Sequence, residues 1–76
     1  MGQCTLITKR GNIVFVSTVK DTYARFWNYE TKIFTLYIDK NYCEEIGEEL
    51  YCEHSQNIKE AMDSHKKACE YAIENL

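Results

Sequence analysis

The first half of the chain alternates apolar and polar residues in short runs that turn-forming residues separate. These runs are rich in Val, Ile, Thr, Phe and Tyr, which favour extended structure. They predict an antiparallel four-stranded β-meander over residues 4–38, with strands near 4–9, 13–19, 23–27 and 32–38. Gly11 and Asn12 are expected to form the first hairpin turn, since glycine tolerates a positive φ.

Alternation also predicts which side chains share a face, because successive residues of a strand point to opposite sides of the sheet. Phe34, Leu36 and Ile38 share one face of the last strand and are expected to form the core. The opposite, outer face is then expected to carry an aromatic and cationic patch, which consists of Tyr23, Arg25, Trp27 and Tyr37.

The pattern changes after residue 38, where apolar positions recur three or four residues apart and Glu, Lys and Ala become common. This spacing predicts helices over about 42–53 and 57–75. Asn41 with Glu44, and Asn57 with Glu60, have the spacing of N-caps and their capping-box partners. Gly47 would cost the first helix about 1 kcal/mol relative to Ala, so a loop with a short strand around 50–52 is the alternative.

The last predicted helix carries an apolar stripe that consists of Ile58, Ala61, Met62, His65, Cys69, Ala72, Ile73 and Leu76. An isolated meander leaves an apolar face in water, and a helix laid across it would cover that face. The sequence therefore predicts a single small α+β domain over residues 1–76, in which the meander packs against one or two C-terminal helices.

Charge is divided unevenly along the chain. Residues 1–38 hold five basic and two acidic side chains, residues 39–76 hold four basic and ten acidic ones, and the net charge is −3. Such asymmetry bears on the choice of partner rather than on the fold. On a helix over 42–53, several glutamates would form an acidic ridge that fits a basic, nucleic-acid-binding surface of a partner protein: Glu44, Glu45, Glu48 and Glu49.

Two histidines and two cysteines have a spacing that resembles a zinc-ligand pattern, C-x-H followed by H-x3-C: Cys52, His54, His65 and Cys69. A histidine and a cysteine four residues apart share a helix face, as paired zinc ligands do. The ligand order matches no conventional finger, so no metal or other cofactor is expected. In the favoured interpretation His65 and Cys69 belong to the buried stripe, and His54 lies in a solvated loop.

The cysteines are expected to be reduced. Cys4, Cys43 and Cys69 fall on predicted apolar faces, and free cysteine is among the most frequently buried residue types. Four cysteines in a short chain also permit disulfides, and a Cys43–Cys52 or Cys52–Cys69 bridge is the alternative.

Neither catalysis nor membrane insertion is expected from the sequence. It contains no nucleophile elbow, P-loop or glycine-rich phosphate cradle, and it has only three glycines. No apolar run approaches the roughly 18 residues that a membrane-spanning helix needs, and the N-terminus lacks the pattern of a secretory signal. The chain is therefore expected to be a non-enzymatic, cytoplasmic protein.

Three functions fit these features. The leading hypothesis is a protein-binding module, a small acidic inhibitor or adaptor whose partner has a basic surface. The second is a small nucleic-acid-binding domain, with or without zinc, because aromatic and cationic side chains stack on bases; the net charge of −3 disfavours it. The third is a structural homodimer that pairs through an edge strand or the aromatic face.

Overall fold

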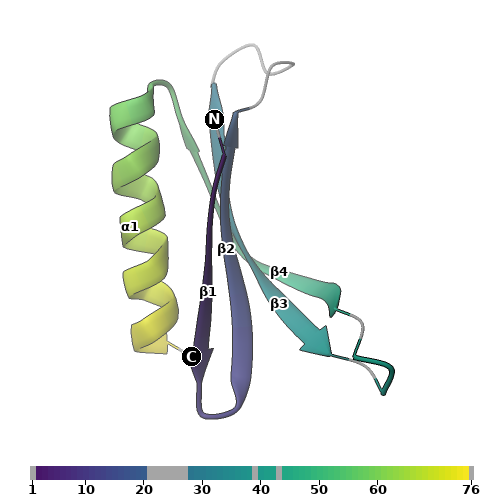
Figure 1. Cartoon of the computed structure of the whole chain (residues 1–76). Coiled ribbons are helices and arrows are strands. Elements are labelled where there is room, and N and C mark those ends of the chain that lie inside the picture. The colour runs from purple at the N-terminus through teal and green to yellow at the C-terminus, as the bar shows by residue number, and fades with distance from the viewer. Residues whose placement is uncertain (1, 21–27, 39, 43, 76) are drawn as a thin grey trace.

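The computed structural model describes residues 2–20, 28–38, 40–42 and 44–75. Four antiparallel strands form one sheet in the order β1-β2-β3-β4, and α1 follows and lies along one face of it (Figure 1). This confirms the α+β prediction of a four-stranded meander with a C-terminal helix. The elements are β1 (Gly2–Lys9), β2 (Asn12–Lys20), β3 (Tyr29–Ile38), β4 (Glu44–Ser55) and α1 (Ile58–Asn75).

Residues 44–55 form a strand where a helix was expected. The helix expected over 42–53 is wrong, because Glu44–Ser55 forms β4 and pairs with β3 from Tyr29↔Ser55 to Ile38↔Glu44. Glutamate favours helix over strand, but helix propensity is small in energy, and pairing with β3 overrides it here. The predicted short strand around 50–52 lies within β4, whereas the strand expected over 23–27 lies outside the described residues.

The first hairpin turns one residue earlier than expected. Lys9 pairs with Asn12, so Arg10 and Gly11 form a two-residue loop, and their φ angles are 53° and 81°. Positive φ at both central positions is the requirement of a type I′ turn, whose twist matches that of the flanking strands. Gly11 meets this requirement without a steric penalty, whereas Arg10 adopts a conformation that side chains disfavour.

The core lies on the face of the sheet that the sequence assigned to solvent. Val16 and Ile33 are cross-strand partners with no exposed surface, and they pack with Val14, Ala68 and Ala72. The predicted core face of Phe34, Leu36 and Ile38 is therefore wrong. Both faces of β3 are apolar, so alternation alone does not reveal which face the helix covers.

Helix α1 begins at the predicted cap. The Glu60 amide donates to Asn57 Oδ1 at 2.9 Å, and Glu60 Oε2 accepts a hydrogen bond from the Gln56 amide at 3.0 Å. The Asn57 cap is confirmed, and the Glu60 carboxylate bonds the amide one residue before the cap, at Gln56. The earlier pair is wrong, because Glu44 is the first residue of a strand.

The buried side of α1 is rotated from the predicted stripe. Larger apolar residues of that stripe, Ile58, Met62 and Ile73, are at least half exposed. Small residues allow the helix backbone to approach the sheet closely, and they occupy the buried side with one histidine: Ala61, Ser64, His65, Ala68 and Ala72. Lys9 of β1 donates to the carbonyl of Ile73 near the end of the helix.

Gly47 lies in β4 at a bulge, where the register with β3 shifts. A Cβ at this position would lie 2.3 Å from Tyr37 Cε2 and 2.4 Å from Thr35 Oγ1. Thr35 Oγ1 also accepts a hydrogen bond from the Glu48 amide at 2.7 Å. Glycine fits this bulge because the side chains of Thr35 and Tyr37 occupy the space that a Cβ would take, and they would have to move to admit one.

Gly47→Ala is expected to lower the free energy of unfolding by about 1–3 kcal/mol, because the new methyl group must displace Thr35 or Tyr37. Chemical denaturation measures this difference. Gly2→Ala is the matched control, since the nearest atom to its Cβ is 4.0 Å away. Equal stability of the two variants would show that the bulge is not packed as described.

Candidate functional site

The sheet face opposite α1, here called the open face, is apolar between Leu6, Phe15, Leu36 and Ile46 and polar toward the end of β4 that leads to α1. It carries the side chains that alternate with the core residues, and Phe15 and Phe34 face each other across β2 and β3 with ring centroids 6.5 Å apart. A hollow of about 410 Å³ lies on this face and is lined by Cys4, Leu6, Phe15, Leu36, Glu44 and Ile46. Leu6 is 57% exposed and Ile46 is 59% exposed.

The predicted acidic residues lie on the edge strand β4 rather than on a helix. Glu44, Glu45, Glu48 and Glu49 are all exposed, and together they form what we call the acidic edge. They do not share one face, since Glu44 lines the hollow and Glu45 pairs with Tyr37. Charged side chains on an edge strand also discourage uncontrolled pairing with other strands.

Only one member of the predicted aromatic patch lies in the described part of the chain. Tyr37 is 57% exposed, but it shares its face of β3 with Ile33 and therefore lies on the side of α1. It is exposed because the far end of β3 turns away from the helix (Figure 1). Tyr23, Arg25 and Trp27 lie outside the described residues.

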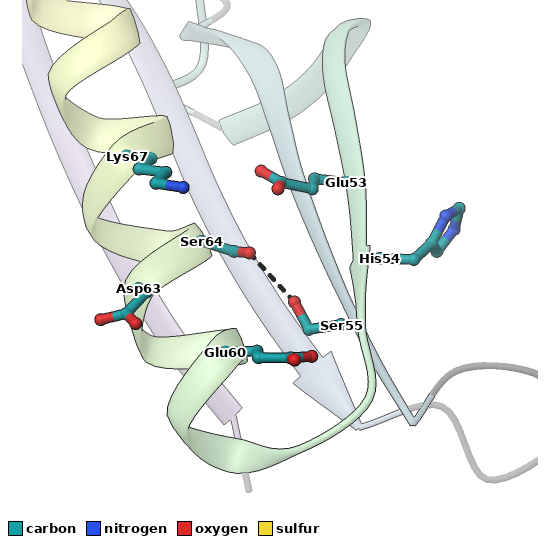
Figure 2. A pocket seen from close by; sticks show the side chains of 7 residues that line it. All are labelled: Glu53, His54, Ser55, Glu60, Asp63, Ser64 and Lys67. Atoms are coloured by element: carbon teal, nitrogen blue, oxygen red, sulfur yellow. Dashed lines mark hydrogen bonds between the residues drawn. The ribbon is translucent and has the colours of Figure 1, made fainter.

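The structure separates the four predicted zinc ligands into two pairs. Cys52 and His54 are exposed on β4, whereas His65 is buried on α1 and Cys69 is half-buried there. Figure 2 shows His54 pointing away from α1, while its neighbours Glu53 and Ser55 point toward it. The thiols of Cys4, Cys52 and Cys69 are free, and Cys43 of the other possible bridge lies outside the described residues.

Cys4 is exposed, so its predicted packing role is wrong, whereas Cys69 packs against the core. Burial and, to a lesser degree, the nearby Glu30 carboxylate raise the pKa of the Cys52 thiol. Glu30 is a neighbour that the sequence pattern did not suggest. It lies opposite His54 across the β3–β4 pairing, and that pairing was not predicted.

His65 occupies a buried polar network and is only 3% exposed. Its Nε2 shares a hydrogen bond with Thr5 Oγ1 at 2.8 Å, and its Nδ1 shares one with Thr18 Oγ1 at 2.7 Å. Thr18 in turn bonds Thr31 at 2.8 Å. Both ring nitrogens have partners within the protein, so this histidine joins the helix to the sheet and is not presented to a ligand.

A second cleft lies between β4 and the first turns of α1 (Figure 2). Its volume is about 190 Å³, which is below the roughly 300 Å³ typical of small-molecule sites. The hydroxyls of Ser55 and Ser64 bond each other at 3.0 Å, so the bond joins β4 to α1 across the cleft. The other lining residues are polar or charged: Glu53, His54, Glu60, Asp63 and Lys67.

Near this cleft, the Tyr51 hydroxyl donates to Glu53 Oε2 at 2.6 Å. This hydrogen bond, with burial, raises the pKa of Tyr51 to about 12. Tyr51 therefore stays protonated at neutral pH and acts as a structural donor.

No protein-family model, curated protein or solved structure matches the chain. Within the described ranges, the structure contains no helix that could span a bilayer.

Stability is expected to fall on mild acidification because of His65. Burial lowers the pKa of His65 below its ordinary value of 6.5. Between the folded-state and the unfolded-state pKa, His65 binds a proton in the unfolded chain but not in the folded chain. The contribution of His65 to the free energy of unfolding is therefore complete above pH 6.5, and it is lost as the pH falls toward the folded-state pKa.

Urea unfolding between about pH 5 and pH 7.5 measures this dependence. His65→Gln removes the titrating imidazole, while the glutamine side chain can still donate and accept hydrogen bonds. The free energy of unfolding of this variant should therefore depend less on pH. An equally steep dependence in the variant would contradict a role for His65.

Proposed function

We propose that this chain is a non-enzymatic protein-binding module, an inhibitor or adaptor that docks through its open face onto a partner protein. The partner surface is apolar at its centre and is bordered by lysine or arginine. The observation that carries the proposal is the apolar hollow on the open face, between Leu6, Phe15, Leu36 and Ile46.

A contiguous apolar surface is the first support. Single exposed apolar residues are normal, whereas a continuous patch usually marks an interaction site. Here Leu6 and Ile46 belong to one hollow, and Ile38 is also more than half exposed. The lining is mostly apolar, with one thiol and one carboxylate, which favours binding over chemistry.

The acidic edge supports a basic partner. Residues 44–53 contain five glutamates and no lysine or arginine, and Glu44 borders the hollow directly. Opposite charge speeds the encounter of two proteins and selects among partners. The same carboxylates disfavour nucleic acid, and they would repel those of a second copy. The free thiols fit a reducing compartment such as the cytoplasm.

The test compares two double variants of apolar residues that are each at least half exposed. Leu6→Ser/Ile46→Ser alters the open face, whereas Ile58→Ser/Met62→Ser alters α1, where the two side chains are 50% and 56% exposed. Partners are captured from the native cells with the unaltered protein and purified, and their affinity is then measured by calorimetry. The open-face variant should bind at least about 30-fold more weakly, while the helix variant should bind normally.

Replacing all four residues of the acidic edge by glutamine should slow association and weaken its dependence on salt. Equal affinity of the open-face variant and the unaltered protein would refute the proposal. Sedimentation of the purified chain is the second readout. A dimer that Leu6→Ser/Ile46→Ser dissociates would identify the open face as a self-association surface and would also refute it.

A further inference from the structure

A cluster of three metal-binding side chains lies on the open face, at the end of β4 that leads to α1. Glu30 of β3 and His54 of β4 are direct cross-strand partners, and Cys52 precedes His54 by two residues on the same face. None of the three lines the apolar hollow. We propose that Glu30, Cys52 and His54 form a zinc site with one coordination position open.

The distances fit a zinc ion. His54 Nε2 lies 3.3 Å from Glu30 Oε2 and 3.8 Å from Cys52 Sγ, and the three ligand atoms all lie within 4.8 Å of one another. Tetrahedral zinc with ordinary bond lengths places its ligand atoms about 3.3–3.7 Å apart. Small side-chain rotations therefore suffice to bring all three atoms onto one ion.

The ligand types favour zinc over the abundant alkaline-earth ions. Magnesium and calcium bind almost entirely to oxygen, whereas a thiolate and an imidazole select zinc or a similar transition metal. Three protein ligands leave one of the four positions of zinc for water or for a group from a partner. The site is exposed, so such a group could reach it.

Lys32 positions the carboxylate of Glu30. Its ammonium group lies 3.2 Å from Glu30 Oε1, which leaves Oε2 directed at His54, and it lies 2.8 Å from Glu49 Oε1. Metal-ligating carboxylates are commonly held in this way by a second hydrogen bond. Two carboxylates against one ammonium leave a net charge of −1 around the cluster, which favours a cation. A zinc ion that binds the Cys52 sulfur displaces the thiol proton to solvent.

This arrangement differs from the four-residue set that the sequence suggested. His65 Nδ1 and Nε2 are occupied by threonine hydroxyls inside the protein, and α1 lies on the other face of the sheet. The contribution of Glu30 arises only because β4 pairs with β3. The site also stands independently of the docking proposal.

The test uses the full chain, freed of metal by a chelator, with zinc and cobalt as probes. Zinc titration should show one ion per chain, and cobalt should give a thiolate charge-transfer band with tetrahedral ligand-field absorption. Cys52→Ser, His54→Ala and Glu30→Gln should each weaken zinc binding at least about tenfold, and Cys52→Ser should also abolish the charge-transfer band. Circular dichroism verifies that each variant is folded.

Cys4→Ser is the matched control, because it removes an exposed thiol from the same face and should leave binding unchanged. The absence of zinc binding would overturn the proposal. So would a cobalt band that survives Cys52→Ser or disappears in Cys4→Ser. A stoichiometry of one ion per two chains would likewise contradict a three-ligand site completed within one chain.

Discussion

One helix can cover only one face of a four-stranded sheet, and the remaining features of this structure depend on which face α1 covers. The helix packs through small residues, so its backbone lies close to Val16 and Ile33, which are fully buried. Burial of each such side chain stabilises the fold by about 1.5–3 kcal/mol. The larger apolar side chains of β2 and β3 point the other way and remain on the open face.

The position of the helix is specified by polar contacts as well as by packing. His65 bonds threonines of β1 and β2, and Thr18 extends the network to β3. Shifting α1 by one turn would leave these buried groups without partners, at a cost of about 1–3 kcal/mol each. The network thus holds the helix on one face, and leaves the other free for the apolar hollow and for the cluster around His54.

The sequence predicts the features that neighbouring residues determine, but not those that depend on contacts between distant segments. The first hairpin and the Asn57 cap depend on neighbouring residues, and both were predicted to within one residue. The pairing of β4 was missed because its glutamates have no strong strand preference. The predicted core face is the wrong one because the neighbours Ile33 and Phe34 are both apolar, and the local sequence does not show which of them faces the helix. Glu30 joined the candidate site only through cross-strand pairing.

The most direct test of which face α1 covers is a nuclear Overhauser measurement on methyl-labelled protein. The structure requires contacts from the Ala68 and Ala72 methyl groups to the methyl groups of Val16 and Ile33, with none to the rings of Phe15 and Phe34. Contacts from the alanine methyl groups to those rings would place the helix on the opposite face, and would contradict the account of the open face.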